Sequence, residues 1–539
     1  MSRRALALAL LVPSLFACAP LSEPLSDEDT SESEKPFSSA RATLVTFELD
    51  GMLTAPWQAE SNTTKLIKDQ LIYTVGQLNA YDSVARLDKV VISNVKRVQN
   101  GDGWMRVTYH ATIPVGWGEP GDIPETFDLT LPRKIGPSSL ASFATDYGPA
   151  CSDAPSDVTS GNYWYHYRPL AEGCAFDPAR VSVATATVTP SSENTTGKFP
   201  ELDRVWEDGA LRVVAVFGKY ADYATDPGDA GIRAYDEFIG AVRSGIGSGF
   251  APTPASLAAA PGVSAPDVTF TGKLADGRDV VINALLIDSP KVATAAFDAR
   301  YAELTKQADL VLYNGHAGLG ANVRALAKKG QFTKGRYTLF FFNGCDTFAY
   351  LDDGLAKRFT ALNPDDPKGT KYLDVATNLM PAYFHAMPEA SLALVNALAT
   401  PDDPKTYPQI FAGIDKKQVV VVTGEEDNVF SPTPDAFAGL DVSGSLARGE
   451  EKRFETPLLA PGTYEIALTE TKPSAAGDVD LHVGVGYAPT TTNFDHRPYL
   501  YGSNETVTVE IDQPSRLFIM LRGYDDAPVA KNGYRLVID

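Results

Sequence analysis

Short apolar runs bounded by turn-forming residues mark the middle of the chain. Residues 310–313 (Leu-Val-Leu-Tyr) precede Asn314, Gly315 and His316, and residues 337–342 (Tyr-Thr-Leu-Phe-Phe-Phe) precede Asn343, Gly344 and Cys345. Each run is β-prone and predicts a buried strand. Residues 321–327 between them predict a helix that two lysines and a glycine end. The pattern indicates a strand–helix–strand unit.

The same alternation of apolar runs and amphipathic segments extends over residues 203–430. Strands are expected at 211–217, 279–287 and 418–423, and helices at 232–242, 292–307 and 376–399, the last interrupted at Pro381 and Pro388. Strands separated by helices favour parallel pairing with right-handed crossovers. The central region therefore predicts a doubly wound α/β domain in a multidomain chain.

Residues 42–200 predict an α+β or mostly β domain. Alternating segments at 43–49, 89–98 and 105–113 are typical of strands, and 64–78 is typical of a helix. The aromatic run at 162–169 is read as a core strand with a buried Trp164, the alternative being a surface that binds sugar or peptide. No motif here indicates a chemistry, so the role of this region stays open.

Residues 436–539 predict a separate β-sandwich. Short alternating runs recur at 453–458, 463–468, 480–485, 506–511 and 517–521, with glycine and proline between them. That spacing of strands and turns is typical of two packed antiparallel sheets.

The first residues have the pattern of an export signal. Arg3 and Arg4 precede an apolar segment that ends in Leu15-Phe16-Ala17-Cys18, which resembles a bacterial lipobox. Residues 1–17 are therefore expected to be a lipoprotein signal peptide and Cys18 the lipidated residue of an outer-membrane protein. An ordinary secretory signal with a chance cysteine is the alternative. Residues 18–41 are acidic and poor in apolar residues, which predicts a disordered tether.

Composition restricts the partners. The 539 residues carry 47 basic and 68 acidic side chains, a formal net charge of −21, with 44% hydrophobic residues. Such a charge disfavours nucleic acid as a partner. The expected partners are a peptide or protein substrate and a membrane reached through the N-terminal lipid.

The expected export of the chain suggests a chemical state for each of its four cysteines. Cys151 and Cys174 flank the aromatic run, and an exported protein meets an oxidising environment, so a disulfide between them is expected. With Cys18 assigned to lipid, Cys345 would remain a free thiol, and a lone thiol in an exported protein indicates reactivity.

His316 and Cys345 are the candidate catalytic pair. Both follow an Asn-Gly turn at the carboxyl end of a predicted parallel strand, the edge where α/β sheets form sites. An imidazole beside a thiol can generate the thiolate, and amides near Ala317, Gly318 and Gly344 would hold an oxyanion. The alternative is an inert buried cysteine. No metal site is expected, because the pair and Asp346 give at most three ligands.

Three carboxylates follow the last predicted strand of the central domain. If Glu425, Glu426 and Asp427 lie at the same sheet edge as the candidate pair, they favour a basic residue before a scissile bond. A solvated acidic turn is the equally weighted alternative.

Two resemblances rest on these motifs. Gly315-His316-Ala317-Gly318 and Asn343-Gly344-Cys345 resemble the catalytic motifs of the caspase-like peptidases, which implies a cysteine endopeptidase without a cofactor. Residues 477–506, with Gly477-Asp478-Val479-Asp480-Leu481-His482 at their start, resemble the bacterial pre-peptidase C-terminal domain. Asp478 and Asp480 are an optional Ca²⁺ site. The second class of function is a non-catalytic surface lipoprotein that binds peptide or protein.

Overall fold

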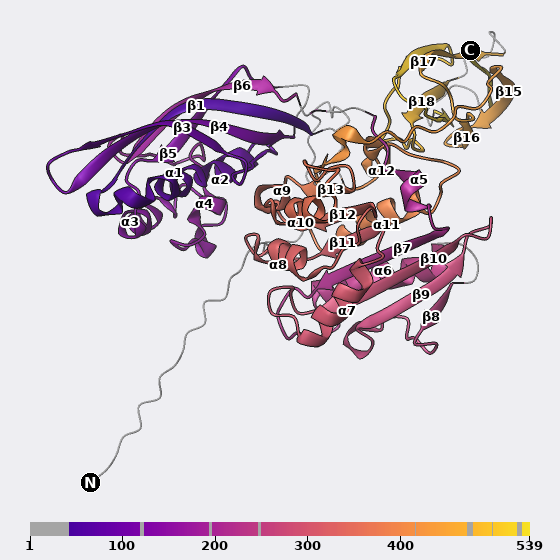
Figure 1. The fold of residues 1–539 in the computed structure, drawn as a ribbon. Helices are drawn as coiled ribbons and strands as arrows, with labels where there is room; N and C mark the ends of the chain where they lie inside the picture. Colours follow the sequence, from indigo (N-terminus) through magenta and orange to yellow (C-terminus); the bar gives the residue numbers. More distant parts are fainter. Residues whose placement is uncertain are drawn as a thin grey trace.

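The chain forms three sheet-containing parts in succession (Figure 1). The computed structural model describes residues 42–118, 123–192, 194, 197–245, 250–415, 417–471, 478–498, 500–524 and 531–539. The expected signal peptide, Cys18 and the acidic tether lie outside these residues. Within the described ranges no helix has the length and apolar character needed to span a bilayer. A multidomain, sheet-rich chain was expected and is observed.

The N-terminal part is an antiparallel sheet with helices on one face (Figure 1). The strand order is β2-β4-β1-β6-β5, and β3 pairs with β4. Side chains alternate along β1, so that Val45, Phe47 and Leu49 are buried against the helices. The elements are β1 (Thr43–Pro56), α1 (Thr63–Leu71), α2 (Tyr73–Asn79), β2 (Val84–Ala85), β3 (Val91–Gln99), β4 (Trp104–Trp117), β5 (Thr126–Pro132), α3 (Pro137–Tyr147), α4 (Tyr163–His166) and β6 (Val181–Pro190).

The aromatic run is a short helix and not the expected strand. Tyr163 and Tyr167 are fully buried, and each packs edge-on against Tyr73 with ring centroids 5.9 and 5.2 Å apart. Trp164, expected to be buried, is only half-buried. The i, i+4 spacing of the two tyrosines places them on one side of the turn, and their packing against α2 overrides the local β preference.

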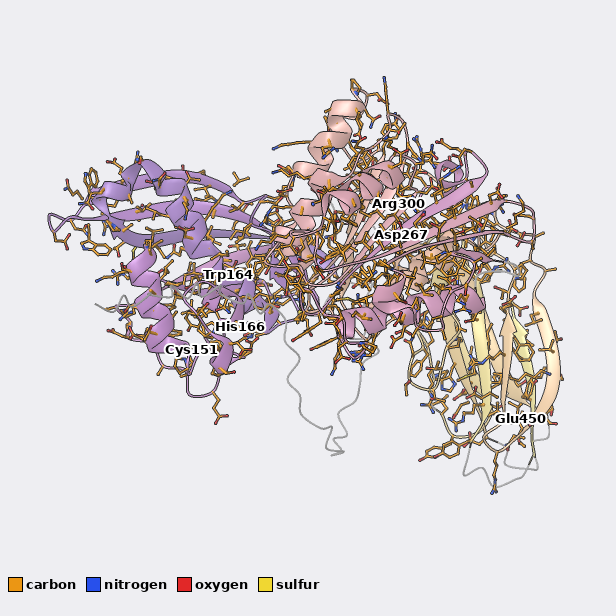
Figure 2. The ribbon with its side chains drawn as sticks, turned by 90° about the horizontal axis from the view of Figure 1, so that it is seen from below. Cys151, Trp164, His166, Asp267, Arg300 and Glu450 are labelled. Atoms are coloured by element: carbon orange, nitrogen blue, oxygen red, sulfur yellow. A yellow bond between two sulfur atoms is a disulfide. The ribbon has the colours of Figure 1, made fainter. Side chains whose placement is uncertain are left out.

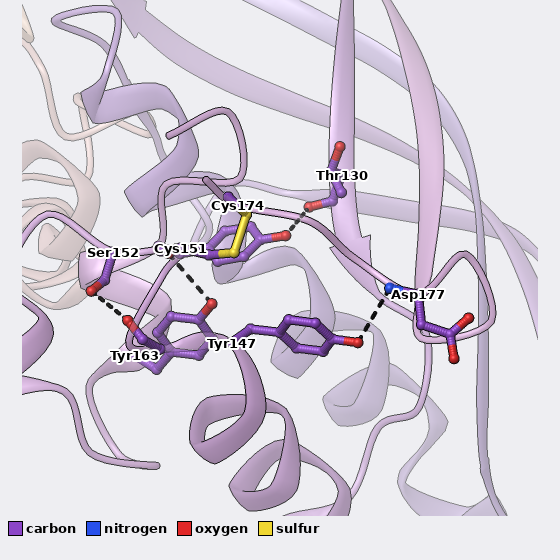
Figure 3. The surroundings of a disulfide bond; sticks show 9 residues. Thr130, Tyr147, Cys151, Ser152, Tyr163, Cys174 and Asp177 are labelled. Carbon is purple, nitrogen blue, oxygen red and sulfur yellow. Dashed lines mark hydrogen bonds between the residues drawn. A yellow bond between two sulfur atoms is a disulfide. The ribbon is translucent and has the colours of Figure 1, made fainter. Parts of the chain in front are cut away.

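A disulfide joins Cys151 to Cys174 in this part (Figure 3). The hydroxyl of Tyr163 donates to the carbonyl oxygen of Cys151 (3.4 Å), and the amide of Asp177 donates to the hydroxyl of Tyr147 (3.3 Å). The bridge therefore ties the segment between α3 and β6 to the aromatic core.

The central part is an eight-stranded sheet of order β14-β13-β12-β11-β7-β10-β9-β8. Strands β13, β12, β11, β7 and β10 are parallel, whereas β14, β9 and β8 run antiparallel to their neighbours. The strands are β7 (Ala210–Gly218), β8 (Ala251–Thr253), β9 (Asp267–Lys273), β10 (Asp279–Ile287), β11 (Leu310–Asn314), β12 (Thr338–Asn343), β13 (Leu373–Asn378) and β14 (Val420–Thr423).

Helices cover both faces of the central sheet, as two separate apolar clusters show. Helices α6 (Ala230–Gly245), α11 (Met387–Leu398) and α12 (Tyr407–Phe411) lie on one face, and α7 (Ala295–Thr305), α8 (Ala321–Lys329) and α10 (Gly354–Leu362) on the other. Arg300 of α7 is ion-paired with Asp267 of β9 (3.0 Å; both labelled in Figure 2). The short helices α5 (Leu202–Val205) and α9 (Thr347–Tyr350) complete this part.

The helix expected at 376–399 is wrong over residues 376–386, nearly half of its length. Residues 373–378 pair with β12 as strand β13, and the helix α11 begins only at Met387. Pro381 prevents a helix from running through this segment, and a free strand position beside β12 recruits the apolar residues before it.

The C-terminal part is a sandwich of two antiparallel sheets, β15-β21-β17-β19 and β16-β20-β18, around one apolar core. Alternation places Leu481, Val483 and Val509 inside. The strands are β15 (Leu440–Ala447), β16 (Glu451–Glu455), β17 (Gly462–Glu470), β18 (Val479–Val485), β19 (Glu505–Ile511), β20 (Leu517–Gly523) and β21 (Lys531–Ile538).

Candidate functional site

Three neighbouring parallel strands each end in a buried asparagine. Asn314 ends β11, Asn343 ends β12 and Asn378 ends β13. The Asn343 amide donates to Asn314 Oδ1 (2.9 Å), and the Asn378 amide donates to Asn343 Oδ1 (3.0 Å). Gln418 Nε2 also donates to Asn343 Oδ1 (2.5 Å), and Ser391 Oγ donates to Asn314 Oδ1 (2.7 Å). This asparagine belt fixes where the loops beyond the strands begin.

Glycines after the belt allow the loops to approach each other closely. Gly315 has φ 154°, and its amide donates to the carbonyl oxygen of Asn343 (3.2 Å). A Cβ at Gly344 would lie 2.5 Å from the carbonyl oxygen of Gly315 and 3.3 Å from the amide nitrogen of Ala317. Gly318 has φ 58°, which strains any other residue. The expected turns at these positions therefore hold the two loops in contact.

His316 and Cys345 reach the same loop between β13 and α11. His316 is half-buried; its Nε2 lies 3.0 Å from the carbonyl oxygen of Tyr220, and its ring is 5.0 Å from that of Phe384. Cys345 is 3% exposed, with Sγ 3.7 Å from the carbonyl oxygen of Ala382. Both residues therefore lie past the carboxyl ends of the neighbouring parallel strands β11 and β12, as the sequence predicted.

The expected free thiol at Cys345 is wrong. Cys345 is disulfide-bonded, and no free cysteine occurs among the residues that the structure describes. A sulfur in a disulfide has no thiolate to attack a carbonyl carbon, so the arrangement does not provide the nucleophile that the sequence suggested.

Asp346, the residue after Cys345, is a buried ionisable residue whose surroundings the sequence did not predict. It is fully buried in a left-handed conformation (φ 50°). Its carboxyl accepts from Asn79 Nδ2 and from the Tyr165 hydroxyl, both at 2.8 Å, across the boundary between the N-terminal and central parts. Burial raises the pKa of Asp346 to about 7. Local sequence patterns do not reveal these contacts, because the two partners lie 181 and 267 residues away along the chain.

The acidic turn after β14 lies at the end of the sheet where the parallel strands begin, whereas His316 lies past the end where they finish. The sequence placed Glu425, Glu426 and Asp427 beside the candidate pair on the assumption of a parallel β14, but β14 is antiparallel to β13. Glu426 Oε2 accepts from the Gly424 amide (2.8 Å), and Asp427 Oδ2 accepts from the Thr370 hydroxyl (3.1 Å). These carboxylates therefore cannot select a residue near His316.

The optional cation site of the C-terminal part is occupied by protein contacts. Asp478 Oδ1 accepts from the Gly502 amide (3.2 Å), and Asp480 is ion-paired with Arg497 (3.3 Å). Within the described parts of the chain, no three His, Cys, Asp or Glu side chains gather closely enough to hold a metal ion.

Comparisons with known proteins relate a short piece of the chain to bacterial peptidases. No family model matches. The alkaline serine exoprotease A of Vibrio alginolyticus is 33% identical over 99 residues, which is 18% of this chain and 18% of the exoprotease. The neutral protease of Vibrio proteolyticus is 44% identical over 50 residues (9% and 8%), and the zinc metalloprotease of Helicobacter pylori is 32% identical over 89 residues (16% and 33%). The chain thus spans a third or less of each of these relatives.

Solved structures give the same small coverage. The pre-peptidase C-terminal domain of a collagenase from Bacillus anthracis is 11% identical and matches 21% of this chain and all of that chain, with a TM-score of 0.16. The solution structure titled vEP C-ter 100 is 26% identical and matches 20% of this chain and 93% of that chain, with a TM-score of 0.15.

The similarity to caspase-like cysteine peptidases is therefore wrong. The relatives are named for serine and metal chemistry, and Cys345 carries a disulfide where that similarity requires a thiol. The comparisons do support a similarity between a short piece of this chain and bacterial peptidases.

Proposed function

We propose that this chain is an exported, peptidase-related protein that binds protein partners through its C-terminal domain. One observation carries this proposal: pieces of at most 99 residues match proteins named for serine and for zinc or metal proteolysis. A serine triad and a metal site require different residues in different geometries. What such relatives share is therefore an accessory module, and proteins are the substrates that proteases have in common.

The assignment of folding units and of location belongs to the same proposal. Residues 42–200, 203–430 and 436–539 are the folding units. The signal pattern of the first residues and the Cys151–Cys174 disulfide support export of the chain.

Polar contacts position the C-terminal module against the central part. Arg516 is ion-paired with Asp403 (2.7 Å), Gln409 Nε2 donates to Ser515 Oγ (2.6 Å), and Asn493 Nδ2 donates to the carbonyl oxygen of Ala412 (3.1 Å). A protein bound by the module would therefore be held beside α12.

Binding of a protein such as casein to the immobilised full chain tests the function. Removal of residues 436–539 should abolish binding, while Arg516→Ala, which weakens docking and leaves the module in place, should retain it. Circular dichroism checks that the truncated chain keeps its central fold. Equal binding by the full and truncated chains would contradict the proposal.

A further inference from the structure

The N-terminal part covers the loops at the carboxyl ends of the central strands. Val75, Val84 and Tyr165 from the N-terminal part form one apolar cluster with Phe348 and Leu379. In Figure 1, α9 lies beside the N-terminal helices, and the ring of Trp164 meets that of Tyr350 at 6.3 Å. Trp164 and His166 are labelled in Figure 2 on the side of the N-terminal part that faces the central part. The interface is thus largely apolar.

One carboxyl lies inside this apolar interface. Asp346 has no exposed surface, and the side-chain groups that donate to it, Asn79 Nδ2 and the Tyr165 hydroxyl, both belong to the N-terminal part. An ion pair across the interface, between Lys89 and Asp353, is exposed and contributes little. Separation of the two parts would therefore bring a fully buried carboxyl into contact with water.

We propose that Asp346 is a protonation-dependent latch: its neutral carboxyl allows the N-terminal part to stay docked on the strand-end loops, and its ionisation loosens that contact. The physical reason is the cost of holding a carboxylate in an apolar interface, which separation relieves by hydration. Loosening would uncover Phe348, Leu379 and the loop that carries Cys345.

The groups around Asp346 set where it titrates. Burial is the largest cause that raises its pKa to about 7; the hydrogen bonds from Tyr165 and Asn79 and the charge of Arg168 oppose it, and the charge of Asp153 adds to it. From the central side, Tyr350 also faces Asp346, and among the described residues its buried hydroxyl has no hydrogen-bond partner. The opposing effects of these groups place the titration of Asp346 between acidic and neutral pH.

The direction and size of the pH effect follow from the thermodynamic linkage between protonation of Asp346 and docking of the N-terminal part. A docked carboxyl that titrates at about 7 keeps a proton that an undocked carboxyl, with the ordinary value of 3.8, has already lost. Docking is therefore favoured at low pH and weakens as pH rises from about 4 to about 7. Between pH 5 and pH 8 the docking equilibrium should fall on the order of a hundredfold.

Hydrogen exchange of the full chain at pH 5, 6, 7 and 8 tests the latch, after correction for the intrinsic exchange rate at each pH. Peptides from α2 and α9 should lose protection progressively, by up to about a hundredfold in the opening equilibrium. In Asp346→Asn the protection of these peptides should not change with pH. The matched control is Asp309→Asn: burial also raises the pKa of Asp309 to about 7, but Asp309 pairs with Arg336 away from this interface, so the variant should keep the pH dependence of α2 and α9.

Tyr165→Phe provides a second test if Asp346→Asn does not fold. It removes a donor that lowers the pKa of Asp346, so the loss of protection should move to higher pH. Constant protection of α2 and α9 in the wild type, an unchanged pH dependence in Asp346→Asn, or an unchanged midpoint in Tyr165→Phe would each overturn the latch.

Discussion

Replacing Asn343 by alanine should be among the most destabilising single changes in the central part. The side chain has no exposed surface and lies between Asn314 and Asn378 in the asparagine belt. It forms four hydrogen bonds: two that its amide nitrogen donates, to Asn314 Oδ1 and the Met387 carbonyl, and two that its oxygen accepts, from Asn378 and Gln418. Alanine keeps the strand and removes all of them.

The size of the stability loss depends on whether the side chains that bind Asn343 keep other hydrogen bonds after the substitution. Asn378 Nδ2 still donates to the carbonyl oxygen of Gly344 (3.1 Å), Gln418 Nε2 still reaches Asn378 Oδ1 (3.2 Å), and Asn314 Oδ1 still accepts from Ser391. None of these side-chain partners is left without a hydrogen bond, so the cost is the net value of the lost bonds. At about 1 kcal/mol each, the free energy of unfolding should fall by roughly 4 kcal/mol.

The free energy of opening of the β11 and β12 amides, measured by native-state hydrogen exchange, reports this change. Asn396→Ala is the matched control, because Asn396 lies on the exposed side of α11 and alanine favours a helix, so its effect should be small. If Asn343→Ala lowers the opening free energy by less than about 1 kcal/mol, the belt does not hold the strand ends and the reasoning fails.

Three further outcomes are expected. Cys151→Ser with Cys174→Ser should lower the stability of the N-terminal part by roughly 3 kcal/mol, because the bridge spans 23 residues; unchanged thermal unfolding with and without reductant would contradict this. Burial lowers the pKa of His482 to about 4, so the unfolded chain binds a proton that the folded one does not, and the C-terminal part should lose up to about 3 kcal/mol as pH falls from 6.5 to 4. His482→Leu should remove this acid loss, since both ring nitrogens are buried without a hydrogen-bond partner; a persisting loss would point to another group. Burial raises the pKa of Asp374 to about 7, so stability of the central part should fall as pH rises from about 4 to about 7. Asp374→Asn should reduce this slope in urea titrations and leave the share that Asp309 contributes; an unchanged slope would refute the assignment.

Local sequence patterns were sufficient where a strand or helix is fixed by its own residues. The apolar runs before Asn314 and Asn343 are strands β11 and β12, and residues 321–327 lie within α8. The alternating runs of the last hundred residues correspond to β16 through β20. In these segments propensity, periodicity and turn residues all favour the same structure.

Long-range packing decided the rest. The direction of β14 depends on its pairing with β13, which no local sequence pattern indicates. Because β14 was predicted to be parallel, Glu425 was predicted at the wrong end of the strands. The role of Asp346 depends on Asn79 and Tyr165, which the chain brings from another part. The pairing of Cys345 likewise could not be read from its position after a turn, because a disulfide is a property of two residues.

The edges of the central sheet have a consequence for recognition. At one edge, β8 is three residues long (Ala251–Thr253), and Pro252 in its middle has no amide hydrogen to donate. At the other, β14 has four residues, and Val421 packs in the cluster that includes Val75 and Val84 of the N-terminal part. Short, proline-containing or covered edges resist pairing with an added strand. Among the described residues of this sheet, an extended peptide therefore finds only short stretches of free backbone to pair with, which disfavours edge-to-edge aggregation and favours recognition by side chains and loops.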